Sequence, residues 1–197
     1  MKLDIPSGPF AGYIFDCDGT LVDTMPLHFR AWNEAMKHAG LSGELSEDLF
    51  YSLGGMPTRK VAAVMAQHYG LKIDVERVFH QKEEIFLKMQ AEMKVIAPVV
   101  DFARQQQGRV PLSVASGGPR PVVMKTLQLM KIDHLFPVVV TPEDVQHGKP
   151  APDMFLLAAE KMGVAPELCL VFEDAEPGFQ AAAAAGMKCV RVPGRTK

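Results

Sequence analysis

The first residues that could do chemistry are two carboxylates, Asp16 and Asp18, which stand two positions apart after a short apolar run. The run, Tyr13–Phe15, is typical of a buried strand, and Gly19 allows the backbone to turn where the strand ends. In an extended chain, alternation places Asp16 and Asp18 on one side and Cys17 on the other. Two like charges at the end of a buried strand repel each other, which raises the question of which cation they hold. By itself the string also fits an Asp/Gly-rich turn that closes a hairpin.

Three further polar features follow other predicted strands, either directly or after a short loop. Because ligands bind outside the carboxyl ends of the strands in an open parallel sheet, we expect all of these features to meet in one pocket. Four carboxylates packed together need a divalent cation, and a set of oxygen ligands favours Mg²⁺ over zinc. The features are Ser116-Gly117-Gly118, Lys149 and Glu173-Asp174.

The chemistry that suits this set is phosphoryl transfer. A phosphate dianion repels an attacking carboxylate, so Lys149 and the cation must screen the charge. Ser116 and the amides of Gly117 and Gly118, at the start of a predicted helix, are suited to hold phosphate oxygens.

The two aspartates then have separate roles. Asp16 can attack phosphorus to give an aspartyl-phosphate, a known form of covalent catalysis. Asp18 can protonate the leaving oxygen and later activate water. The sequence therefore predicts a covalent phosphoryl-transfer enzyme.

The elements that position these residues alternate between strands and helices. Such alternation predicts an α/β fold with a doubly wound, parallel, Rossmann-like sheet. The predicted strands are residues 13–15, 111–115, 138–140, 169–172 and 189–192, and helices are predicted between the last four of them.

Between the first predicted strand and the others lies a block that is helical throughout. Leu27, Ala31 and Ala35 recur every four residues, Ser46 is a suitable helix cap, and further helices are predicted over 57–70 and 75–93. We expect an inserted all-helical cap domain, residues 26–93, on a core domain formed by residues 1–25 and 94–197.

The composition narrows the class of protein. The 197 residues are 48% hydrophobic and 22% charged, with a formal net charge of −2. That balance predicts a globular core and gives no reason to expect nucleic acid or a membrane as partner. The three cysteines are widely spaced and odd in number, and the N-terminus has prolines where a signal peptide needs an apolar region. We expect a soluble, cytoplasmic monomer that acts on a small phosphorylated metabolite.

Four motifs, in order and suitably spaced, resemble those of the haloacid dehalogenase superfamily. The resemblance extends from Ile14 to Arg191. The helical insertion with His28, Ala31 and Trp32 is similar to the beta-phosphoglucomutase-like branch. The motifs are Phe15-Asp16-Cys17-Asp18-Gly19-Thr20-Leu21, Ala115-Ser116-Gly117, Gly148-Lys149-Pro150-Ala151-Pro152-Asp153 and Phe172-Glu173-Asp174-Ala175.

The resemblance implies a role for each matching residue. Asp16 is implied as the nucleophile and Asp18 as the acid/base, while Ser116 and Lys149 hold the transferring phosphoryl group. The implied Mg²⁺ ligands are Asp16, the Asp18 carbonyl, Glu173 and Asp174. The implied substrate-binding residues are Gly19, Thr20, His28, Arg59, Gly117 and Gly118. The inserted helices are implied to close over the substrate and choose the leaving group.

Purely structural roles also fit some of these residues. Ser116 could merely cap the helix that follows it. Glu173 could support a metal ligand without being one. His28 and Arg59 could be ordinary helix residues, and Cys17 is best explained by packing.

Within the family, the sequence favours a phosphatase over a mutase. The mutases carry a Ser-Lys-Asn-like run where this chain has Gly118-Pro119-Arg120, and Arg59 stands one place later than the arginine of their cap loop. One residue on a helix corresponds to about 100° of rotation. The stretches GGMPT and FEDAEPGFQAA resemble fructose-1-phosphate-type phosphatases, so we expect a Mg²⁺-dependent sugar-phosphate phosphatase, with a phosphohexose mutase as the alternative.

Two other classes use similar residues. A phosphoacceptor signalling module also combines acids, Mg²⁺ and a lysine, but the helical insertion of about 65 residues argues against it. A haloalkanoate dehalogenase would use Asp16 without metal, which would leave Asp18, Glu173 and Asp174 as superfluous like charges.

Overall fold

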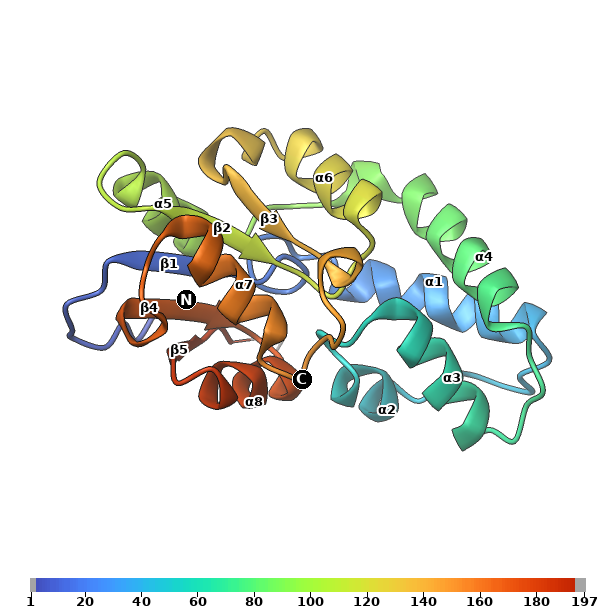
Figure 1. Cartoon of the computed structure of the whole chain (residues 1–197). Helices are drawn as coiled ribbons and strands as arrows, with labels where there is room; N and C mark the ends of the chain where they lie inside the picture. Colours follow the sequence, from blue (N-terminus) through green and yellow to red (C-terminus); the bar gives the residue numbers. More distant parts are fainter. Residues whose placement is uncertain (1–2, 194–197) are drawn as a thin grey trace.

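The computed structural model describes residues 3–193, so residues 1–2 and 194–197 of the predicted core domain lie outside the described part. Its centre is a parallel sheet with the strand order β3-β2-β1-β4-β5 (Figure 1). The five strands agree with the predicted ones to within one residue at every end. They are β1 Gly12–Phe15, β2 Leu112–Ala115, β3 Val138–Val140, β4 Cys169–Glu173 and β5 Lys188–Arg191.

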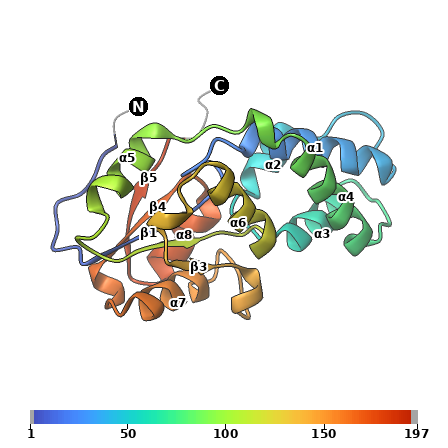
Figure 2. The same cartoon turned by 90° about the horizontal axis from the view of Figure 1, so that it is seen from above.

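Helices cover both faces of the sheet (Figure 2). Phe15, Val114 and Phe172 point to the face covered by α5, Ala97–Gln106, and α6, Arg120–Leu129. Ile14, Ala115 and Val171 point to the opposite face, covered by α7, Asp153–Met162, and α8, Glu176–Ala184. Because successive strand residues alternate between faces, apolar runs in these strands bury both faces at once. The predicted doubly wound α/β fold is confirmed.

Four helices lie between β1 and α5 in the chain, and they gather at one end of the sheet in both views (Figures 1 and 2). We call them the cap helices: α1 Met25–His38, α2 Glu47–Ser52, α3 Thr58–His68 and α4 Val75–Lys88. They enclose a hydrophobic cluster of their own around Trp32, Phe50 and Met65. The division of the chain into two domains at residues 25/26 and 93/94 stays a prediction.

The helix predicted over 75–93 is shorter than expected. It ends at Lys88, and a single 3₁₀ turn, Gln90–Glu92, follows before the chain becomes extended at Met93. The extension has a structural reason, because the chain here returns to the core alongside the outgoing connection. Ser46 caps α2 as predicted, by accepting a hydrogen bond from the amide of Leu49 at 3.2 Å.

The two connections between the cap helices and the sheet are paired with each other. Val22 and Val95 form an antiparallel bridge, and the amide of Asp23 donates to the carbonyl of Lys94 at 2.8 Å. The amide of Ile96 donates to the carbonyl of Leu21, also at 2.8 Å. This pairing holds the entry and exit of the insertion together next to the end of β1.

Short 3₁₀ turns complete the described elements, at Asp133–Leu135, Pro142–Asp144 and Pro166–Leu168. None of the helices in the described part of the chain has the length and apolarity needed to cross a bilayer.

Candidate active site

A buried lysine joins two acids that come from neighbouring strands. Asp16 follows β1 directly and Glu173 is the last residue of β4, while Lys149 belongs to the loop after β3. Lys149 Nζ donates to Asp16 Oδ1 at 2.7 Å and to Glu173 Oε2 at 2.9 Å. The side chain of Lys149 is 0% exposed. The parallel sheet thus brings together residues that stand more than 130 positions apart, as the sequence predicts.

The electrostatics of this group are unbalanced. Burial, and then the nearby charge of Glu173, raise the pKa of Asp16 well above its usual range. Burial opposes the charged form of Lys149, but Asp16 and Glu173 outweigh it and raise the pKa of this lysine. Lys149 therefore stays cationic, and two carboxylates compete for its single charge.

A third acid completes a potential metal site. One ligand oxygen each from Asp16, Glu173 and Asp174 lies within 4.8 Å of the others. Burial raises the pKa of both Glu173 and Asp174 to about 7, the latter also through the charge of Asp16. Within residues 3–193, Glu173 Oε1 is buried and has no hydrogen-bond partner. A cluster of oxygen donors with excess negative charge and an unsatisfied oxygen fits a Mg²⁺ ion. The predicted contribution of the Asp18 carbonyl stays a prediction.

The carboxylate of Asp18 belongs to a separate network. Thr24 Oγ1 donates to Asp18 Oδ1 at 2.6 Å, and His28 Nε2 lies 3.1 Å from the same oxygen. Burial alone would raise the pKa of Asp18, but His28 and Thr24 lower it to about 2. The His28 ring in turn stacks on Phe86 with ring centroids 3.9 Å apart. Asp18 is thus held as a carboxylate, and Thr24 is a site residue that the sequence analysis missed.

Gly19 and Thr20 lie away from the pocket, against Asp174. Thr20 is fully buried, and its hydroxyl donates to Asp174 Oδ1 at 3.2 Å. Gly19 has a φ of +88°, and a Cβ atom there would lie 2.2 Å from Asp174 Oδ2. The turn after β1 folds both residues onto Asp174, and the expectation that they contact substrate stays a prediction. Their role in this structure is to position that acid.

The Ser116-Gly117-Gly118 turn follows β2 and faces the cap helices. Ser116 Oγ accepts a hydrogen bond from the amide of Gly118 at 3.1 Å. A Cβ on Gly117 would lie only 2.4 Å from the carbonyl oxygen of Gly55, in the loop between α2 and α3. Gly117 therefore allows the cap loop to approach the turn.

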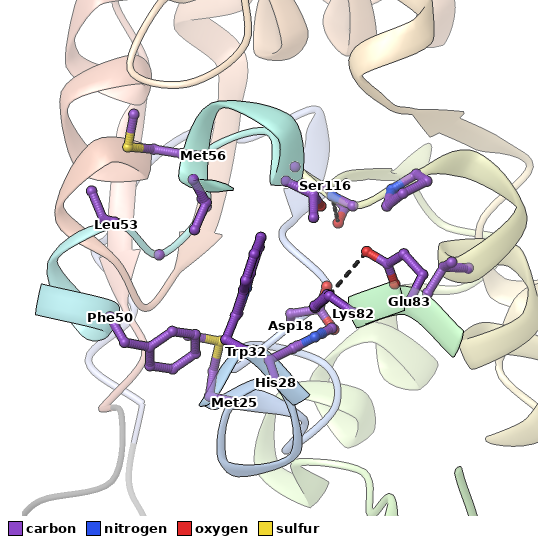
Figure 3. A pocket seen from close by; sticks show the side chains of 18 of the residues that line it. Asp18, Met25, His28, Trp32, Phe50, Leu53, Met56, Lys82, Glu83 and Ser116 are labelled. Carbon is purple, nitrogen blue, oxygen red and sulfur yellow. Dashed lines mark hydrogen bonds and ion pairs between the residues drawn. The ribbon is translucent and has the colours of Figure 1, made fainter. Parts of the chain in front are cut away.

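These groups open into a pocket between the sheet and the cap helices (Figure 3). In that view the apolar side chains of Phe50, Leu53 and Met56 lie on one side, while Ser116 and Glu83 lie on the other. The wall is thus part apolar and part polar. Its residues include Asp16, Asp18, Met25, His28, Trp32, Phe50, Leu53, Gly54, Gly55, Met56, Thr58, Val61, Lys82, Glu83, Ser116, Gly117, Gly118, Pro119 and Val122.

Lys82 and Glu83 are pocket residues that the sequence analysis did not single out. Lys82 is 2% and Glu83 7% exposed, and Lys82 Nζ donates to Glu83 Oε1 at 3.0 Å. A signal was present in the sequence, because both lie on the buried stripe of α4 with Val78, Phe79 and Phe86. Two adjacent charges on the apolar side of an amphipathic helix mark a functional candidate.

Arg59 is not brought to the pocket. Its Nε donates to Glu76 Oε1 at 2.6 Å, its guanidinium lies 3.9 Å from the Phe79 ring centroid, and its side chain is 51% exposed. The expected substrate contact stays a prediction, and helix geometry explains why Arg59 is not part of the pocket wall. Thr58, the first residue of α3, faces the pocket, and one further residue turns the side chain by about 100°.

Comparison with known proteins agrees with this geometry. Residues 13–192 match the family described as haloacid dehalogenase-like hydrolase. The chain belongs to this family. The predicted family and its hydrolase class are therefore confirmed.

Two curated relatives match along nearly the whole chain. The chain is 39% identical over 183 residues to the fructose-1-phosphate phosphatase YqaB of Escherichia coli, covering 93% of this chain and 96% of the relative. It is 31% identical over 179 residues to a phosphorylated carbohydrates phosphatase of Thermotoga maritima, covering 89% and 81%. A beta-phosphoglucomutase structure from Clostridium difficile superposes with a TM-score of 0.80 at 20% identity, covering 91% and 83%, which supports the fold.

Proposed function

We propose that this protein is a Mg²⁺-dependent phosphatase of small sugar phosphates that works through an aspartyl-phosphate on Asp16. The observation that carries the proposal is the buried group of Lys149, Asp16 and Glu173, with Asp174 beside it, at the edge of a pocket rimmed by Ser116. The resemblance to phosphatases of phosphorylated sugars supports the substrate class.

The proposed first step is attack by an Asp16 carboxylate oxygen on phosphorus. The new O–P bond forms as the bond from phosphorus to the leaving sugar oxygen breaks, and Asp18 gives that oxygen a proton. Water then attacks phosphorus while Asp18 takes its proton, and the bond from phosphorus to the Asp16 oxygen breaks. This step releases inorganic phosphate and restores the Asp16 carboxylate. Lys149 and Ser116 hold the phosphoryl oxygens throughout.

Asp16, Glu173 and Asp174 would hold the Mg²⁺ ion, with the Asp18 carbonyl as a further ligand. When bound, the ion supplies positive charge that offsets the repulsion between the carboxylates and the phosphate dianion. Lys149 supplies the same kind of charge from the protein, and its two ion pairs fix its position before substrate arrives.

The ionisation of Asp18 supports its role as the base, and its role as the acid requires that the substrate raise its pKa. With a pKa of about 2 in the substrate-free protein, it is a carboxylate and ready to act as a base. A phosphate dianion next to it raises its pKa, because a nearby like charge favours the protonated form. The substrate itself thus promotes protonation of the group that must act as the acid.

A phosphatase is supported over a mutase by the cap side of the pocket. A mutase must hold a second phosphate, yet Arg59 pairs with Glu76 outside the pocket and Pro119 lines the wall where the mutases carry a lysine.

The three cysteines are free, which fits a reducing compartment, and we place the protein in the cytoplasm.

The test is phosphate release from a panel of sugar phosphates, with and without Mg²⁺, by the wild type and by Asp16→Asn. The panel contains fructose 1-phosphate, 6-phosphogluconate, glucose 6-phosphate and β-glucose 1-phosphate. We expect Mg²⁺-dependent release that falls at least about 10³-fold in Asp16→Asn, because a nucleophile is lost.

The same assay distinguishes the alternatives. Formation of glucose 6-phosphate from β-glucose 1-phosphate, with little free phosphate, would establish the mutase instead. Activity that survives EDTA would contradict the metal requirement, and full activity of Asp16→Asn would contradict the covalent route.

A further inference from the structure

A buried ion pair from α4, Lys82 and Glu83, lines the same pocket as Asp18 and Ser116. Lys82 Nζ donates to Glu83 Oε1, and Lys82 also lies 5.6 Å from the centroid of the Trp32 ring and 5.1 Å from that of Phe86. The other carboxylate oxygen, Glu83 Oε2, is buried and has no hydrogen-bond partner among the described residues. A buried carboxylate oxygen without a donor is costly, so a ligand donor at this place would stabilise it.

The charges around this pair leave no free cation for a second anion. Lys82 is the only lysine or arginine among the pocket-lining residues that the structure describes, and Glu83 already pairs with it. Arg59, the next candidate, is paired with Glu76 on the outer surface. A phosphate or carboxylate on the leaving group would therefore meet a neutralised lysine and a carboxylate of the same sign.

We propose that Glu83 is a specificity-determining residue that selects phosphate monoesters with a neutral, hydroxyl-rich leaving group. This inference rests on the proposed phosphatase function and deepens it. Glu83 Oε2 accepts a hydrogen bond from a hydroxyl of the sugar, and the same negative charge excludes leaving groups that carry a second phosphate or a carboxylate.

The buried surroundings of Glu83 strengthen both its proposed hydrogen bond to the sugar and its repulsion of anionic leaving groups. Glu83 is only 7% exposed, and its partner Lys82 lies over the rings of Trp32 and Phe86. Low local polarity strengthens hydrogen bonds and like-charge repulsion alike. Lys82 fixes the carboxylate through Oε1, which leaves Oε2 as the oxygen without a donor. Selectivity by repulsion needs no additional contact with the preferred substrate.

The experiment compares fructose 1-phosphate with fructose 1,6-bisphosphate, which differ only in the second phosphate. The kcat/KM of each is measured for the wild type, for Glu83→Gln and for Glu84→Gln. Glu84 carries the same charge on the same helix but is exposed, so it is the matched control. We expect the wild type to favour the monoester at least about tenfold, and Glu83→Gln to reduce that ratio about tenfold. Glu84→Gln should keep the wild-type ratio.

The outcomes separate this inference from the proposed function. One outcome is that the wild type and Glu83→Gln both hydrolyse p-nitrophenyl phosphate and fructose 1-phosphate yet have the same ratio of kcat/KM for fructose 1-phosphate to that for fructose 1,6-bisphosphate. That result overturns the role of Glu83 and leaves the proposed function standing. A lack of Mg²⁺-dependent hydrolysis of any ester overturns the proposed function. In that case the fluorescence of Trp32, the single tryptophan and a pocket residue, still reports binding of the two fructose esters. If the wild type binds both fructose esters with equal affinity, the inference is overturned. This binding test uses the wild type alone, so it does not require Glu83→Gln to fold.

Discussion

Asp18 depends on two neighbouring side chains for its charge. Thr24 and His28 both contact its Oδ1 atom, and the threonine contact is the shorter, at 2.6 Å. Because these contacts lower the pKa of Asp18 to about 2, they stabilise the folded state wherever this carboxylate is ionised. The stabilisation is present above the unfolded-state pKa of about 4 and is lost as the pH falls towards 2.

We predict that Thr24→Val lowers the free energy of unfolding by about 1–3 kcal/mol at pH 6, because a hydrogen bond to a buried carboxylate is lost. The difference from the wild type should shrink at pH 3, where Asp18 begins to protonate. Urea unfolding at both pH values measures it. A difference that is the same at pH 6 and pH 3 would show that Thr24 acts only through packing.

The pKa values of the metal-site acids Glu173 and Asp174 are shifted in the opposite direction from that of Asp18. Burial raises the pKa of Glu173 and Asp174 to about 7, so between about pH 4.5 and 7 the folded protein without metal binds more protons than the unfolded chain. Stability therefore falls as the pH rises through this range.

We predict that Mg²⁺ reverses this trend. Bound Mg²⁺ favours the ionised acids, so its stabilising effect should grow from pH 5 to pH 7.5, with protons released on binding. Thermal unfolding with Mg²⁺ and with EDTA at several pH values tests this. The variant Asp174→Asn should lose most of the effect, and an unchanged Mg²⁺ response in that variant would exclude Asp174 as a ligand.

At the scale of elements, the loop between α2 and α3 packs directly on the loops of the sheet. A Cβ on Gly148 would lie 2.4 Å from Pro57 Cγ, and one on Gly54 would lie 2.9 Å from the Cβ of Ala175. The cap helices thus meet the sheet through small residues that leave no spare room. Such contacts leave little space for water between the cap loop and the loops of the sheet.

We predict that Gly148→Ala lowers kcat/KM about 10- to 100-fold, because the added methyl group collides with Pro57 and keeps the cap loop away from the site. Kinetics of the single and double variants measure this. Pro57→Ala removes the colliding atoms, so the double variant Gly148→Ala/Pro57→Ala should recover most of the activity. If the double variant is no better than Gly148→Ala, the loss comes from the backbone next to Lys149 and not from the cap contact.

At the scale of the whole molecule, one hydrophobic cluster joins the sheet to the cap helices. Leu27 of α1 and Phe86 of α4 belong to the same cluster as Phe15 and Phe172 of the sheet. Phe86 is fully buried and supports the His28 ring. The cap helices and the sheet therefore share part of their stability, although the cap helices also have a cluster of their own.

We predict that Phe86→Ala destabilises the protein by about 3–5 kcal/mol and lowers its Tm by roughly 10 °C. Phe86→Leu keeps more of the volume and should cost less than half as much. Calorimetry should show a single transition in both variants. Two separate transitions in Phe86→Ala would mean that the cap helices unfold independently of the sheet.

Much of the fold and of the phosphate-handling site follows from local sequence. Apolar runs such as Tyr13–Phe15 form strands because both faces of a parallel sheet are buried. Since parallel strands present their carboxyl ends at one edge, Asp16, Lys149 and Asp174 were predictable as neighbours from the sequence alone. Short-range sequence patterns, together with the common position of the carboxyl ends of parallel strands, were sufficient to predict that these residues are neighbours.

The cap side of the pocket depended on tertiary structure. Whether Arg59 or Thr58 faces the substrate is decided by about 100° of helix rotation, and that rotation is fixed by packing against Phe79 and Glu76. Lys82 and Glu83 were hidden within a helix whose polar positions are mostly exposed, and only the packing of α4 on α1 and the sheet buries them. The sequence by itself determined the chemistry at the strand ends, because topology brings those residues together. The proposed choice of leaving group rests on side-chain directions that only the assembled cap helices decide.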